Sequence, residues 1–78
     1  MKKYMVIEYY KPGCFRAIYE RFNQQGRLLP EGLHNLDSWV SKDKNICFQL
    51  MESDNAELFP GWLKRWDDLM AFEVYPID

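Results

Sequence analysis

Three acidic side chains are the residues of this sequence with the clearest potential for proton transfer. Glu8, Asp37 and Glu73 lie in segments with strand character, and alternation along those strands places them on one face of a sheet. Carboxyl groups buried near one another lose hydration and repel, which raises the pKa of one of them toward the range useful for acid–base catalysis. Acids on a solvated surface are the ordinary alternative.

The single histidine and the two cysteines form no catalytic or metal-binding pattern. His34 and Asp37 are three residues apart on a strand and face opposite sides, so they do not pair as the base and acid of a triad. Cys14 and Cys47 are far apart in the sequence, and no CxxC or HxxxH spacing occurs. The glycines are scattered and make no phosphate-binding loop. We therefore expect no metal and no cofactor.

One arginine and two tryptophans are candidates for a ligand site. Arg27 follows a predicted helix, where it could close over a cavity and hold an anionic ligand, or could instead cap carbonyl groups at the helix end. Trp62 and Trp66 are four residues apart on one helix face, and core packing is the simpler explanation for them.

The amount of apolar material is large for so short a chain. The 78 residues suffice for one domain, residues 1–78, and 47% of them are hydrophobic and 17% aromatic. A monomer of this size buries only about 60–65% of its unfolded surface. Part of the apolar surface should then be covered by another chain, which indicates an oligomer.

Charge and cysteine content limit the class of protein. The formal net charge of −2 argues against a nucleic-acid partner, because phosphate neutralisation drives such binding. No segment approaches the roughly 20 apolar residues of a membrane span. The N-terminal run MKKYMVIEYY lacks the apolar core of a signal peptide, and two cysteines are too few for a disulfide scaffold. We expect a cytoplasmic protein with reduced thiols.

The first half of the chain predicts a strand followed by a helix. Residues Tyr4–Tyr10 are rich in β-branched and aromatic side chains, with both faces largely apolar, which indicates a central strand. Apolar residues then recur at helical spacing over residues 14–26, at Phe15, Ile18, Tyr19 and Phe22. Gly26 is a natural helix stop.

Two strands and a second helical stripe follow. Residues 33–40 and Ile46–Glu52 are joined by the short polar segment 41–45, so they pair as an antiparallel hairpin. A second apolar stripe comprises Leu58, Phe59, Trp62, Leu63, Trp66, Leu69 and Met70. Pro60 lies inside it, so either the main helix begins near Pro60 or residues 54–59 form a separate turn.

The last segment completes a four-stranded sheet. Phe72–Ile77 reads as a strand, and Pro76 places it at a sheet edge because proline cannot donate to a strand ladder. The order βαββαβ predicts an α+β fold, a ferredoxin-like plait with a four-stranded antiparallel sheet and both helices on one face. The first and third strands should be central.

Side-chain alternation indicates a helix-free sheet face of mixed composition. If Ile46, Phe48 and Leu50 face the helices, the free face collects Tyr4, Val6, Glu8, Asn35, Asp37, Trp39, Cys47, Gln49, Met51, Glu73 and Tyr75. Such a face suits a homodimer interface with a polar centre, or a ligand cavity within that interface. An open, solvated sheet is the remaining alternative.

Several runs of residues resemble a known family. The resemblance lies in GRLLPEGL at 26–33, SWV at 38–40, CFQLME at 47–52, Trp62 with Trp66, Asp68 and Leu69, and FEVYP at 72–76. These runs resemble a family of small bacterial proteins, the domain of unknown function DUF3303. The resemblance implies a ferredoxin-like plait of the dimeric α/β-barrel type, and it brings no established activity or catalytic residues.

The sequence as a whole favours a small-molecule-binding homodimer with an unknown ligand. Its cavity is expected either between the helices and the sheet or between the subunits, and the residues expected to line it are Glu8, Arg27, Trp39, Gln49 and Trp66. A cofactor-free enzyme of the same architecture is the first alternative, an isomerase or monooxygenase-like protein acting on a small aromatic or carbonyl compound with Glu8 as base. A structural or regulatory interaction module is the second, because fold alone does not decide among these functions.

Overall fold

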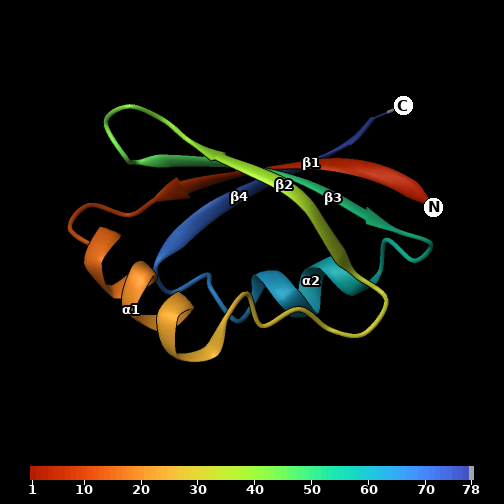
Figure 1. Ribbon diagram of the computed structural model, residues 1–78, viewed down its shortest axis with the longest axis horizontal. Coiled ribbons are helices and arrows are strands. Elements are labelled where there is room, and N and C mark those ends of the chain that lie inside the picture. The colour runs from red at the N-terminus through yellow and green to blue at the C-terminus, as the bar shows by residue number, and fades with distance from the viewer. Residues whose placement is uncertain (78) are drawn as a thin grey trace.

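The chain forms one antiparallel sheet with two helices on the same side. A computed structural model describes residues 1–77 in the order β1 (Lys2–Tyr10), α1 (Phe15–Gln25), β2 (His34–Val40), β3 (Ile46–Ser53), α2 (Leu58–Leu63) and β4 (Met70–Ile77). Figure 1 shows the sheet as one layer, with α1 and α2 together beneath it. The predicted ferredoxin-like α+β fold is confirmed.

The order of the strands follows from their composition. The sheet runs β2-β3-β1-β4, and each neighbouring pair is antiparallel. β1 and β3 are central, as predicted for β1 from its two apolar faces and for both strands from the ferredoxin-like order. β4 lies at an edge of the sheet. Pro76 has no backbone N–H, and an edge strand tolerates this because only one of its sides pairs with another strand.

The second helix is shorter than the apolar stripe suggests. α2 ends at Leu63, and the chain continues through tight turns, in which the amides of Arg65 and Trp66 bond to carbonyls three residues back. Pro60 falls in the first turn of α2, where backbone N–H groups have no partner within the helix. The helix therefore begins just before Pro60, at Leu58.

On β1 and β3 the two sheet faces are exchanged relative to the assignment expected from the sequence, whereas Asp37, Trp39, Glu73 and Tyr75 lie on the helix-free face as expected. Ile46, Phe48 and Leu50 lie on the helix-free face, together with their register partners on β1. The helix-covered face instead carries Tyr4, Val6, Glu8, Cys47, Gln49 and Met51, all of which are buried. The more apolar side of β3 is thus the uncovered one, so hydrophobicity alone selects the wrong face.

A β-bulge changes the alternation along β2. The register shifts between Asn35 and Asp37, so Leu36 has no partner on β3. As a result Asn35 and Ser38 lie on the helix-covered side, whereas Asp37 and Trp39 lie on the uncovered side. The residues that the sequence grouped on one face therefore separate between the two.

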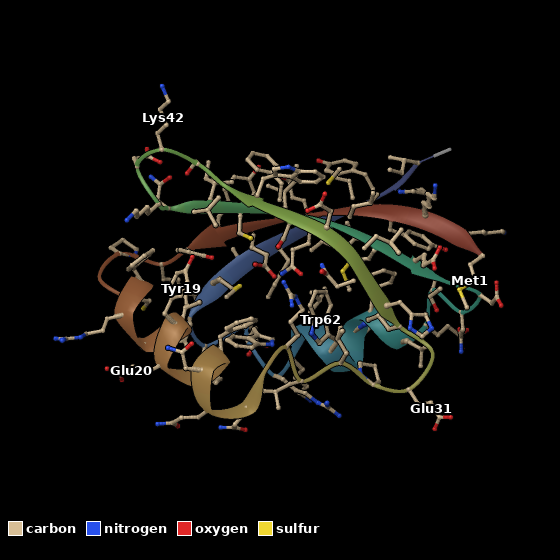
Figure 2. All side chains as sticks on the ribbon, viewed as in Figure 1. Met1, Tyr19, Glu20, Glu31, Lys42 and Trp62 are labelled. Atoms are coloured by element: carbon tan, nitrogen blue, oxygen red, sulfur yellow. The ribbon has the colours of Figure 1, made fainter. Side chains whose placement is uncertain are left out.

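The core lies between the sheet and the helical segments. Its fully buried members include Val6 and Met51 on the central strands and Trp62 on α2. In Figure 2, Trp62 lies between α2 and the sheet. Tyr4 packs edge-on against Phe59, with ring centroids 4.9 Å apart, which joins β1 to the start of α2.

Truncation of a core side chain tests which sheet face is the core. We expect Met51→Ala to lower the free energy of unfolding by about 2–5 kcal/mol, because it leaves a cavity under the sheet. Leu36→Ala, at an exposed position on the bulge, should cost about 0.5 kcal/mol or less. Urea denaturation measures both, and equal losses would contradict this location of the core.

Candidate functional site

A cavity of about 220 Å³ lies under the helix-covered face of the sheet. It is partly open to solvent between α1 and β2. Its lining comes from every strand, from α1 and from the segment that contains α2: Glu8, Tyr10, Ile18, Tyr19, Phe22, Arg27, Ser38, Val40, Cys47, Gln49, Trp62, Trp66 and Met70. Apolar and aromatic walls with a few polar groups are typical of ligand pockets.

Two tryptophans anchor the backbone of Arg27. The indole Nε1 of Trp62 donates to the Arg27 carbonyl oxygen at 2.8 Å, and Nε1 of Trp66 donates to the same oxygen at 3.0 Å. Both indoles are buried, so each needs a hydrogen-bond acceptor, and one carbonyl oxygen can accept both bonds. The spacing of four residues therefore brings both indoles to one point at the mouth of the cavity.

The backbone around Arg27 turns sharply after α1. Gly26 ends the helix with φ +68°, and its N–H donates to the Phe22 carbonyl at 2.8 Å. Leu28 has φ +59°, a left-handed conformation that is uncommon for a leucine. The Leu28 carbonyl accepts a bond from Arg65 Nη1 at 2.5 Å, which helps to hold this turn. The turn directs the Arg27 side chain back over the sheet.

A line of polar side chains crosses the cavity from Arg27 to Glu8. Arg27 Nε donates to Gln49 Oε1 at 3.3 Å, and Arg27 Nη2 donates to Ser38 Oγ at 3.2 Å. Gln49 Nε2 in turn donates to Glu8 Oε2 at 2.7 Å. Asn35 Nδ2 also donates to Gln49 Oε1, at 2.9 Å. The line connects the loop after α1 to β3 and then to β1.

Burial raises the pKa of Glu8. The side chain is only 4% exposed, and loss of hydration is the largest influence on its carboxyl group. Hydrogen bonds from Gln49 and Cys47 and the charge of Arg27 act in the opposite direction without cancelling it. The carboxyl group therefore holds a proton at a pH where an exposed glutamate is ionised.

The Cys47 thiol and the Tyr10 phenol in the cavity are uncharged at neutral pH. Burial, reinforced by the nearby Glu8 charge, raises the pKa of the Cys47 thiol to about 12. Burial likewise raises the pKa of the Tyr10 phenol. Cys47 is thus a protonated thiol and a poor nucleophile at neutral pH, and Arg27 supplies the permanent charge of the cavity.

The structure brings together four of the five residues expected to line a site. Glu8, Arg27, Gln49 and Trp66 all border the cavity. Trp39 does not, because it lies on the opposite face of the sheet and is 48% exposed. The residues were grouped on the helix-free face, but they border a cavity between the sheet and the helices, one of the two places expected for the cavity.

The expected cluster of three carboxyl groups does not form. Glu8 lies on the helix-covered face, whereas Asp37 and Glu73 lie on the other face, on the two opposite edge strands. The pKa of Glu8 is therefore raised by burial and not by repulsion from other carboxylates. The pKa of Glu73 is lowered by hydrogen bonds from the hydroxyls of Tyr75 and Tyr9.

Some cavity residues are not recognisable from the sequence as site residues. Tyr19 and Phe22 belong to the apolar stripe of α1, which the periodicity assigns to the core. Their partial exposure, 37% each, shows that they border an opening instead. Figure 2 shows Tyr19 extending from α1 toward the sheet. Ser38 reaches the cavity only because of the bulge in β2, which carries no sequence signal.

The described part of the chain offers no metal centre and no membrane span. Within residues 1–77, no three His, Cys, Asp or Glu side chains lie close enough together to hold a metal ion. None of the helices in that range has the length and apolar content to cross a membrane.

Comparison with known proteins assigns the chain to a family. The family model "Domain of unknown function (DUF3303)" matches residues 2–77, and the chain therefore belongs to this family. No protein with curated annotation matches the chain significantly.

The raised pKa of Glu8 predicts a pH-dependent difference in stability. The folded chain binds the Glu8 proton more tightly than the unfolded chain does, so this group loses its stabilising effect as the pH rises from about 4.3 through the raised pKa. Glu8→Gln has no carboxyl group to titrate at this position. As the pH rises over this range, the free energy of unfolding of Glu8→Gln should therefore increase relative to that of the wild type. Urea denaturation at several pH values measures the difference.

A matched control is Gln24→Ala on the exposed surface of α1, which removes no titratable group and should follow the wild-type pH profile. A Glu8→Gln profile parallel to the wild-type profile would show that burial does not perturb this carboxyl group.

Proposed function

We propose that this DUF3303 protein is a homodimer that binds a small organic molecule in the cavity between the sheet and the helices of each subunit. The observation that supports binding most strongly is the polar line from Arg27 to Glu8, which runs through an otherwise apolar and aromatic cavity. A plain core would fill this space with apolar side chains, because buried polar groups add no stability unless all their hydrogen bonds are made.

The size of the cavity limits the ligand. A cavity of about 150 Å³ in another protein accommodates benzene, and the cavity here is about 220 Å³. A ligand with one ring and a small polar substituent fits this volume. Larger, drug-sized compounds usually occupy pockets of about 300–1,000 Å³.

Filling the cavity should prevent binding. Val40→Phe places a ring in the cavity from β2. Binding is measured by the indole NMR signals of Trp62 and Trp66, which also line the cavity. Compounds that shift these signals in the wild type should not shift them in Val40→Phe. A library of single-ring fragments supplies the compounds. Ala17→Phe, which adds the same ring on the exposed side of α1, should leave binding unchanged.

Two results would overturn the binding proposal. One is a library in which no fragment perturbs the indole signals. The other is a Val40→Phe variant that binds the same fragments as tightly as the wild type.

The helix-free sheet face supports the second half of the proposal, the homodimer. It carries nine apolar side chains, which are half-buried or exposed in a single chain: Met5, Ile7, Tyr9, Trp39, Ile46, Phe48, Leu50, Tyr75 and Ile77. In Figure 2 no helix lies over the side chains above the sheet. An apolar patch of this kind is unusual on a monomer, and sheet-on-sheet packing between two copies would cover it.

Four polar side chains of this face are already paired within the chain. The hydroxyls of Tyr9 and Tyr75 each donate to one oxygen of the Glu73 carboxylate at 2.5 Å. Asp37 Oδ1 accepts the backbone N–H of Ser38 at 2.8 Å. Burial of these groups against a second copy would therefore leave few of their hydrogen bonds unmade, while the row of Lys3, Glu52 and His34 at one end of the face would lie at the rim of the interface.

A charge at the centre of the face should separate the subunits. We expect the wild type to sediment at twice the chain mass of 9.4 kDa at micromolar concentration, and Leu50→Lys to sediment as a monomer. Gln25→Lys, at the exposed end of α1, is the control and should remain dimeric. A wild type that sediments as a monomer would contradict the dimer.

One observation favours a catalytic alternative, a cofactor-free enzyme. Glu8 combines a raised pKa with a position on the cavity wall, which suits a general acid or base acting on a carbonyl compound. Turnover that is lost in Glu8→Gln and retained in His34→Ala would distinguish catalysis from binding alone.

A further inference from the structure

The charge inside the cavity is unevenly balanced. Arg27 and Glu8 are the lining residues that carry opposite formal charges, but they do not contact each other, because Gln49 lies between them. Among residues 1–77 the ion pairs involve Arg16, Arg21 and the N-terminus, and none involves Arg27. Burial raises the pKa of Glu8, which shifts the balance of charge in the cavity toward the positive Arg27.

The guanidinium of Arg27 is held in place but not saturated. Its Cζ lies 5.1 Å from the centroid of the Phe22 ring, and its backbone is fixed by the two indoles. The bonds to Gln49 and Ser38 are long, at 3.3 and 3.2 Å, and use Nε and Nη2. A guanidinium has five N–H donors, so within the described chain three remain for a ligand. A fixed fork of donors suits a planar carboxylate.

The orientation of Gln49 determines where Glu8 holds its proton. Gln49 Oε1 accepts bonds from Arg27 and Asn35, so Nε2 must face Glu8. Glu8 Oε2 is therefore an acceptor, and a proton on this carboxyl group lies on Oε1. Protonated Glu8 is then a second hydrogen-bond donor for a ligand that carries acceptor oxygens.

The walls beside Arg27 suit a flat, apolar group. Trp66 and Tyr19 border the cavity together with Phe22, and Ile18 and Met70 complete its apolar part. Arg21 stacks over Trp66 with its Cζ 5.4 Å from the ring centroid and pairs with Asp68 through two bonds of 2.9 and 2.7 Å. The Trp66 ring is thereby fixed from outside, and it presents a rigid surface to the cavity.

We infer that the ligand is a small monocarboxylate built on a single planar ring, with its carboxylate oxygens on the Arg27 guanidinium and its ring among Trp66, Tyr19 and Phe22. This inference rests on the proposed binding function and adds the chemical class of the ligand. A carboxylate supplies the negative charge that the cavity lacks, and a single ring fits its volume.

Three simple probes test the chemical class. Benzoate has both the ring and the charge, benzamide has the ring without the charge, and acetate has the charge without the ring. Titrations followed by the indole signals of Trp62 and Trp66 should show benzoate binding about tenfold or more tightly than either of the others, because a hydrogen bond to a charged group is stronger than one to a neutral group.

Variants at two arginines test the role assigned to Arg27. Arg27→Gln should weaken benzoate binding about tenfold or more and leave benzamide binding nearly unchanged. Arg16→Gln, which removes an exposed charge on α1 outside the cavity, should not change either affinity. Arg27→Gln should fold, because it is the backbone carbonyl of Arg27 that holds the tryptophans. If it does not fold, the wild-type comparison of benzoate with benzamide decides alone.

The outcomes separate this inference from the proposed function. Equal affinity for benzoate and benzamide, or unchanged benzoate binding in folded Arg27→Gln, overturns the monocarboxylate class and leaves small-molecule binding intact. If benzoate does not bind while other fragments of the single-ring library bind, the monocarboxylate class is also overturned and small-molecule binding is left intact. No binding by these probes or by any library fragment overturns both proposals.

Discussion

The arrangement of the cavity depends on one backbone carbonyl group that accepts two indole hydrogen bonds. Trp62 and Trp66 both donate to the oxygen of Arg27, and this joins the α2 segment to the loop that follows α1. Neither helical segment is long, so each depends on tertiary contacts for its position. The same two bonds fix the backbone from which the Arg27 side chain reaches the cavity. Core packing and site construction are thus served by the same pair of residues.

The fold was predictable because its main signals are local. Alternation and β-branched content identify the strands, helical spacing identifies α1, and Pro76 marks the edge strand. The extent of α2 was less accessible, since the apolar stripe continues to Met70 through turns that keep similar spacing. The order of elements then leaves few topologies, and the ferredoxin-like arrangement is one of them.

The residues of the candidate cavity were predictable in part, and the sequence left two places open for the cavity, between the sheet and the helices or between subunits. Glu8, Gln49, Arg27 and Trp66 were expected near a ligand because their types suit one, and they do border one cavity. The covered face of β1 and β3 was assigned wrongly, because the covered side of β3 is its more polar side. The bulge in β2 then separates Trp39 from the other candidates, because it puts Trp39 on the uncovered face. Parity within a strand is readable from a sequence, whereas the face that the helices cover depends on long-range packing.

The central claim is that burial raises the pKa of Glu8 beside a charged arginine that it does not contact, so that the cavity favours an anion. A ¹³C NMR titration of the Glu8 side-chain carboxyl group measures this most directly. The account predicts a midpoint above 4.5, the ordinary value for a glutamate. A midpoint at or below that value would mean a carboxylate that offsets the charge of Arg27, and would contradict the account.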